Sequence, residues 1–113
     1  MQDRAFINAF CATFPGAEVS QPFGPEHDCW KVAGKIFAII GQAGDGVSVK
    51  TDHVDTARLL IETGRALRAP YLHASWAQIP FGLIADDELR ERIASSYRLI
   101  RAGLPKKVQA ALG

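Results

Sequence analysis

The fold of this chain is set by residues 28–41, which read DCWKVAGKIFAIIG. Apolar residues dominate both sides of Gly34-Lys35, and a two-residue connection with glycine first is typical of a type II′ β-hairpin. We therefore predict two antiparallel strands, Asp28–Ala33 and Ile36–Gly41. The turn fixes the register. The predicted cross-strand pairs are Ala33 with Ile36, Val32 with Phe37, and Trp30 with Ile39.

A third strand is predicted at Gly46–Thr51, where two valines alternate with polar residues. Successive side chains of a strand point to opposite faces of its sheet. Inward-facing valines place Lys50 on the outer face, and the hairpin register places Lys31 on that face too. The glycine-rich connection at Gly41–Gly46 is expected to be a turn and not a phosphate-binding loop, because it lies between two strands and opens no helix.

Helical periodicity covers much of the remaining chain, with acidic residues, glycine and proline as start and stop signals. The predicted helices are Asp3–Phe14, a helix from the N-cap Asp52 to Gly64, a long helix that starts at Asp86 and ends before Pro105, and Lys106–Leu112. Further strands are predicted at Glu18–Phe23 and Ser75–Phe81. Runs of strands between helices favour an α+β fold of two layers, an antiparallel sheet with helices packed on one face.

The chain has 113 residues, of which 48% are hydrophobic and 22% charged, and its net charge is +1. This composition is typical of a globular protein, and we treat residues 1–113 as a single domain. No apolar run reaches the ~20 residues of a membrane span, and no signal peptide is recognisable at the N-terminus. Two cysteines, Cys11 and Cys29, suit a reducing compartment. We expect a cytoplasmic protein with no membrane partner.

Charge is unevenly distributed along the chain. Residues 1–64 contain five basic and eight acidic side chains, whereas residues 65–113 contain eight basic and four acidic ones. No acidic residue follows Glu91. Such an asymmetry marks either a surface for nucleic acid or other anions, or a solvated helix face, and the sequence leaves both interpretations open.

The sequence contains no recognisable catalytic or metal-binding motif. His27, His53 and His73 lack the spacing of a zinc site, and the two cysteines are too scattered to complete one. We therefore predict no enzyme activity, no catalytic residue, no metal and no cofactor. An enzyme site that contains His73 or Cys29 is the third and weakest alternative.

Several cations lie close in sequence to aromatic residues. Lysines contact phosphates, and exposed aromatic rings can stack on bases. Alternatively, the tryptophans are core anchors and the lysines are ordinary solubilising residues. The candidates for stacking or ligand contact are Tyr71, His73 and Trp76.

Five short motifs follow one another along the chain: PGAE at 15–18, PFGP at 22–25, WKVAGKIFA at 30–38, VSVK at 47–50 and LPKK at 104–107. In order and spacing they resemble the MmcQ/YjbR family of small bacterial proteins. The resemblance implies a CyaY-like architecture, as in frataxins, and DNA binding by a double-wing arrangement. Relatives often have a longer basic segment where this chain has LHAS at 72–75. The lysines that match the family's motifs, and that we expect to contact nucleic acid, are Lys31, Lys35, Lys50, Lys106 and Lys107.

Two functions of different classes are consistent with these observations. The first is non-enzymatic binding of double-stranded DNA with little sequence preference, through a lysine-bearing sheet face and a hairpin wing. The alternative is a protein- or small-ligand-binding module that uses an apolar sheet face. That face would carry Cys29, Ile36, Ala38 and Ile40. The oligomeric state is left open by the sequence.

Overall fold

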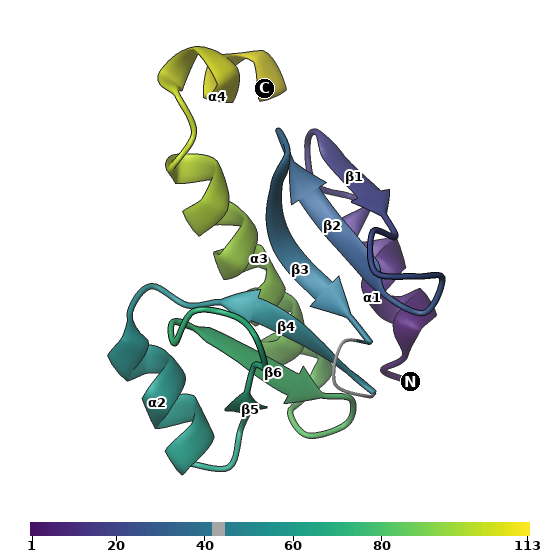
Figure 1. Cartoon of the computed structure of the whole chain (residues 1–113), viewed down its shortest axis with the longest axis vertical. Helices are drawn as coiled ribbons and strands as arrows, with labels where there is room; N and C mark the ends of the chain where they lie inside the picture. The colour runs from purple at the N-terminus through teal and green to yellow at the C-terminus, as the bar shows by residue number, and fades with distance from the viewer. Residues whose placement is uncertain (42–44) are drawn as a thin grey trace.

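The computed structural model describes residues 1–41 and 45–113. Six strands form one antiparallel sheet in the order β1-β2-β3-β4-β6-β5, and α1 and α3 lie behind it (Figure 1). This is the two-layer α+β fold predicted from the sequence. The strands are β1 (Ala17–Ser20), β2 (Asp28–Val32), β3 (Lys35–Ile40), β4 (Gly46–Lys50), β5 (Leu67–Arg68) and β6 (Trp76–Pro80), and the helices are α1 (Arg4–Cys11), α2 (Val54–Glu62), α3 (Asp86–Ala102) and α4 (Lys106–Leu112).

The core lies between the sheet and the two helices behind it. Three aromatic rings meet there: Phe14 stacks on Tyr97 with ring centroids 4.5 Å apart, and Phe37 of β3 meets both rings edge-on. The hydroxyl of Tyr97 donates a hydrogen bond to the Pro15 carbonyl at 2.6 Å. The cluster therefore joins α3, the sheet and the segment after α1. Within the described ranges, no helix is both long and apolar enough to cross a membrane.

The β2–β3 hairpin turns one residue earlier than predicted. Ala33 and Gly34 occupy the turn with φ angles of 48° and 81°, so Val32 pairs with Lys35 and not with Phe37. Positive φ at both central positions is the signature of a type I′ turn, whose twist matches that of the flanking strands. The predicted II′ turn at Gly34-Lys35 is therefore wrong.

An irregularity in the β2–β3 ladder follows this turn. Trp30 pairs with Ala38 and Lys31 pairs with Ile36, so Phe37 is an extra residue on β3. A bulge of this kind changes the alternation of side chains along a strand. Phe37 and Ala38 both belong to the core, and Ile39 is opposite Cys29. All three predicted pairs, Ala33 with Ile36, Val32 with Phe37 and Trp30 with Ile39, are consequently wrong.

The apolar sheet face expected in the alternative reading is not an open surface. Ala38 and Ile40 are core residues, Cys29 has no exposed surface, and Ile36 is half-buried. The bulge at Phe37 is the physical reason, because it turns Ala38 and Ile40 toward the helices. The hypothesis of a binding module that uses this sheet face therefore loses the exposed apolar surface that it needs.

The sheet divides between β3 and β4. These strands pair only where Ala38–Ile40 meets Val47–Val49. The next pair would join Phe37 and Lys50, but the Ser96 hydroxyl of α3 lies between them. Its Oγ donates to the Phe37 carbonyl at 2.6 Å and accepts the Lys50 N–H at 2.9 Å. Buried Ser96 thus satisfies two backbone groups that the ladder leaves unpaired, at what we call the split.

Two half-sheets meet at the split, and they diverge from it (Figure 1). The first comprises β1, β2 and β3, and the second comprises β4, β6 and β5. As predicted, Val47 and Val49 face the core. Strand alternation then places Lys50 on the outer side, and the inward-facing Trp30 and Val32 place Lys31 there as well.

The start of α2 differs from the prediction by one residue. His53 is the N-cap, and its Nδ1 accepts the Asp55 N–H at 3.0 Å. The predicted cap, Asp52, instead accepts a hydrogen bond from the Thr56 hydroxyl at 2.6 Å. This hydrogen bond lowers the pKa of Asp52.

Other element bounds agree in part with the sequence. α1 ends at Cys11 and not at Phe14, β1 covers Ala17–Ser20, and the two-residue β5 was not predicted. α4 has the predicted bounds, Lys106–Leu112. The predicted turn at Gly41–Gly46 includes residues 42–44, which lie outside the described residues.

A buried polar network fastens α1 to β2. Asp28 is 3% exposed and accepts hydrogen bonds from Arg4, Asn8 and Gln21, at 2.9 Å from Arg4 Nη2. The pKa of Asp28 lies well below its usual range, and the hydrogen bond from Arg4 is the main cause. Asn8 Oδ1 accepts the indole N–H of Trp30 at 2.8 Å. Every member of the network has a partner, so we assign it to the fold.

Candidate nucleic-acid interface

Lys35 and Lys50 line the same hollow beside the split. Lys35 begins β3, directly after the type I′ turn, and Lys50 ends β4. The hollow has a volume of about 250 Å³, and we call it the lysine hollow. Cations from both half-sheets therefore share one site. Its other walls come from the C-terminal end of α3 and the turn that follows, at Leu99, Ile100, Gly103 and Leu104.

Lys50 is held by the β5–β6 loop, residues 69–75. Its Nζ donates a hydrogen bond to Ser75 Oγ at 2.8 Å. That hydroxyl also lies 2.9 Å from His73 Nδ1, and the Ser75 carbonyl accepts hydrogen bonds from the N–H and the hydroxyl of Thr51. These contacts fix the ammonium group without neutralising its charge. His73 and Ser75 are therefore positioning residues for Lys50.

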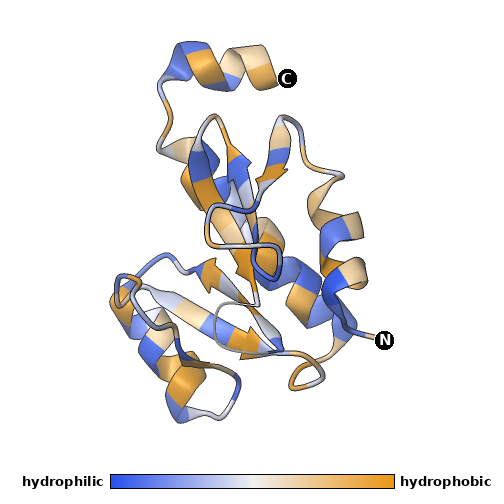
Figure 2. Cartoon of the chain, turned by 45° about the vertical axis from the view of Figure 1, so that its right-hand side comes forward, coloured by the Kyte–Doolittle hydropathy of each residue, from blue (hydrophilic) through white to orange (hydrophobic). Residues whose placement is uncertain are grey.

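The lysine pair of α4 follows the wall of the lysine hollow closely in the chain. Leu104 lines the hollow, and Lys106 and Lys107 are exposed at the start of α4. α4 packs at the end of the first half-sheet, where Leu112 lies against Gly16, just before β1, and leaves no room there for a Cβ. Figure 2 shows a hydrophilic start of α4 followed by hydrophobic residues.

Lys31 lies on the first half-sheet, in β2. It is half-buried, opposite Glu18 of β1 and Ile36 of β3. Opposite charges that face each other across antiparallel strands attract. Of the predicted lysines, Lys35 and Lys50 line the same hollow. Lys31 belongs to the same hairpin as Lys35.

Lysines and arginines differ in how they are paired in this chain. Within the described residues, none of the five lysines forms an ion pair. Five of the eight arginines do, with acidic partners. Among the described residues, the cations without an acidic partner are consequently the five lysines and three arginines, Arg68, Arg92 and Arg101. The paired arginines are Arg4, Arg58, Arg65, Arg90 and Arg98.

The three aromatic or histidine candidates differ in their exposure. Tyr71 is 97% exposed and has a φ angle of 65°, whereas Trp76 is only 9% exposed. Little of the Trp76 ring is therefore available for stacking. His73 is exposed, and its Nδ1 is engaged with Ser75.

Neither cysteine has the environment of a nucleophile. Cys11 is buried, and burial raises the pKa of its thiol to about 12. Burial also raises the pKa of Cys29. Thiols with raised pKa values stay protonated at neutral pH and react slowly. In the described part of the chain, no three His, Cys, Asp or Glu side chains are grouped to hold a metal ion.

Sequence reasoning missed two residues that shape the lysine hollow. Ser96 lies between Ile93 and Tyr97 on the apolar stripe of α3, and a hydroxyl on a core-facing stripe is a signal that it has a buried partner. Ser75 had no comparable signal, since its role depends on the loop that brings it to Lys50.

The family model described as YjbR matches residues 12–99, more than three quarters of the chain. The chain belongs to the YjbR family. This confirms the family resemblance seen in the motifs around the β2–β3 hairpin and β4.

A solved structure is similar over the whole chain. The crystal structure of Deinococcus radiodurans protein DR2400, with a DUF419 domain, has a TM-score of 0.85 and 22% sequence identity. The match covers 100% of this chain and 89% of the other. At this identity the likeness establishes the fold. No curated protein matches the chain.

Proposed function

We propose that this YjbR protein binds double-stranded DNA without catalysing a reaction and with little sequence preference. The observation that carries the proposal is that Lys35 and Lys50, from different half-sheets, line one hollow. Their ammonium groups have no acidic partner in the described residues. Phosphates supply the charge that such lysines lack, and contacts to phosphates carry no sequence information.

Two of the other lysines extend this surface, because Lys106 and Lys107 follow the Leu104 wall of the lysine hollow. Lys31 lies on the hairpin that carries Lys35 but on its opposite face, since Lys35 pairs with the inward-facing Val32. The hairpin and α4 would lie along the sugar-phosphate backbone, and the exposed Tyr71 ring would supply an apolar contact. The resemblance to the family's double-wing description supports the same assignment.

Salt dependence tests the proposal, because each phosphate contact releases condensed counterions. About five contacts predict that raising salt from about 50 to 200 mM weakens binding several hundredfold. The measurement is fluorescence anisotropy of a labelled duplex at several salt concentrations. Undetectable binding at the lowest salt would overturn the proposal.

A pair of double variants locates the surface. Lys35→Gln with Lys50→Gln should reduce the slope of log affinity against log salt by about two, roughly one for each lost contact. Arg65→Gln with Arg98→Gln removes the same charge from two arginines that are already paired with glutamates. This control should change the slope little, and equal losses in both variants would mean that binding depends on net charge alone.

A further inference from the structure

A second and larger hollow lies between α2, β5 and the β5–β6 loop. Its volume is about 410 Å³, within the range of small-molecule sites. Val54 and Ile61 of α2 and Ala74 of the loop form an apolar floor. Three charged residues complete the lining, and we call the site the arginine hollow. They are Arg58, Glu62 and Arg68.

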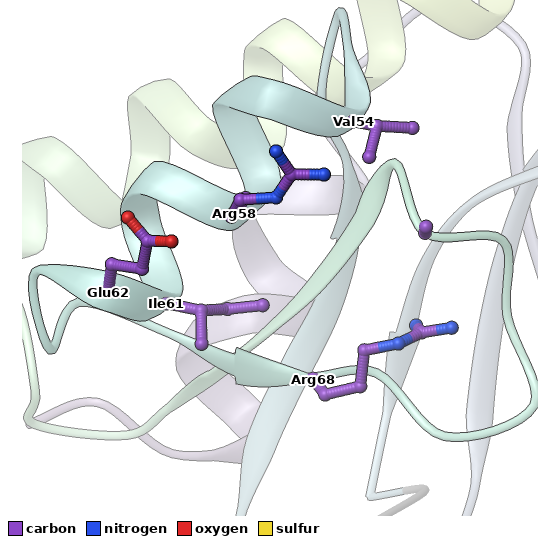
Figure 3. A pocket seen from close by; sticks show the side chains of 6 residues that line it. Val54, Arg58, Ile61, Glu62 and Arg68 are labelled. Carbon is purple, nitrogen blue, oxygen red and sulfur yellow. The ribbon is translucent and has the colours of Figure 1, made fainter.

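Arg58 and Glu62 come from α2 on one side of this hollow, and Arg68 comes from β5 on the other (Figure 3). Arg68 is fixed by its own loop, because its guanidinium donates hydrogen bonds to the carbonyls of Ala69 at 2.8 Å and Leu72 at 3.0 Å. A guanidinium has five N–H donors, so Arg68 keeps donors for a ligand.

Arg58 is also available to a ligand. Its one ion pair, with Asp55, is long at 3.3 Å, and both side chains are well exposed, at 62% and 73%. Exposed pairs of this kind contribute little energy and exchange partners readily. Arg58 and Arg68 therefore each keep donors for an anionic group that lies in the hollow between them, with the apolar floor beside it.

We propose that the arginine hollow binds a small organic acid, with its carboxylate between Arg58 and Arg68 and its hydrocarbon body on Val54, Ile61 and Ala74. Guanidinium groups match the planar geometry of a carboxylate. The apolar floor favours a ligand with a hydrocarbon body over inorganic phosphate, which would leave the floor uncovered. The residues that line this site differ from those that line the lysine hollow.

A titration followed by amide chemical shifts in nitrogen-15 spectra tests the site with three probes. Hexanoate should give saturable shifts at α2 and residues 68–75, with a dissociation constant on the order of 1 mM for so small a ligand. Two control ligands should each bind at least about tenfold more weakly than hexanoate. Hexanol keeps the hydrocarbon body but loses the contacts of the carboxylate with the arginines, and inorganic phosphate keeps a negative charge but loses the contacts with the apolar floor. Equal binding of hexanol, tighter binding of phosphate, or no saturable shift with hexanoate would each overturn the proposal.

Two variants separate recognition from folding. Arg58→Gln removes a guanidinium whose side-chain partner among the described residues is the exposed Asp55, and it should weaken hexanoate binding about tenfold with hexanol binding unchanged. Arg98→Gln removes a similarly exposed arginine that lies on α3, and it should leave hexanoate binding unchanged. Equal loss in both variants would show attraction by net charge in place of a site.

Discussion

The lysine hollow and the arginine hollow each combine two cationic side chains with apolar walls, yet they hold their cations differently. Lys35 stands at an exposed hairpin tip, and Lys50 has one neutral partner, Ser75. Arg68 is fixed by two backbone carbonyls, and Arg58 has an acidic neighbour. The lysine hollow lies where the sheet divides, whereas the arginine hollow lies under a helix at the sheet's edge.

This difference separates two kinds of anion recognition. An ammonium group is a point charge that attracts a phosphate from any direction, and a fixed guanidinium selects a planar group in one orientation. We therefore assign the polyanion to the lysine hollow and the small carboxylate to the arginine hollow. The two sites share the β5–β6 loop, since Ala74 lines the arginine hollow and Ser75 holds Lys50.

The largest effect is expected from Ser96→Ala. The variant leaves the Lys50 N–H and the Phe37 carbonyl without their buried partner, at about 1–3 kcal/mol for each group. The free energy of unfolding in urea should fall by about 2–4 kcal/mol. Chemical shifts should change around the lysine hollow, while hexanoate still binds the arginine hollow.

Ser95→Ala is the matched control for this variant. Ser95 precedes Ser96 on α3, is only half-buried, and forms no side-chain hydrogen bond among the described residues. Its replacement should change the unfolding free energy by less than about 0.5 kcal/mol. Similar losses for both serines would refute the role of Ser96 at the split.

The second prediction concerns how the stability of the protein depends on pH through Asp28, which lies in the half-sheet that carries Lys35. The pKa of Asp28 is lowered in the folded protein relative to the unfolded value of about 3.9. The ion pair with Arg4 therefore stabilises the fold at neutral pH, and this contribution declines progressively as pH falls from about 4 toward the much lower folded pKa. Asp28→Asn should cost about 2 kcal/mol in urea unfolding at pH 7 and progressively less as pH falls below about 4. A cost that does not change with pH would contradict the assigned cause.

The smallest expected effect is a gain in stability from a substitution in the β2–β3 turn. Ala33 has a φ angle of 48°, a conformation that Asn adopts more easily than Ala. Ala33→Asn creates the Asn-Gly pair preferred in type I′ turns and should raise the unfolding free energy by about 0.5–1 kcal/mol. The arginine hollow should be unaffected. A loss of stability in urea unfolding would argue against a type I′ turn beside Lys35.

Much of the fold could be predicted from the sequence, because helical stripes and glycine or proline signals are local. The long helix from Asp86 and the bounds of α4 were predicted on that basis. The hairpin register could not be predicted, since Ala33-Gly34 and Gly34-Lys35 are both plausible turns and only the packing of Phe37 selects between them. The lysines of the site were predicted, but the split that brings Lys35 and Lys50 together depends on Ser96, which is 59 residues away from Phe37 in the chain.

The most direct test of the account compares Lys35→Gln with Arg58→Gln. Each variant removes one exposed positive charge, the first from the lysine hollow and the second from the arginine hollow. Duplex affinity should be measured by anisotropy at several salt concentrations for both variants and the unmodified chain. We predict that Lys35→Gln lowers the slope of log affinity against log salt by about one and that Arg58→Gln leaves it unchanged. An equal change of slope in the two variants, or a change only in Arg58→Gln, would contradict the assignment of DNA to the lysine hollow.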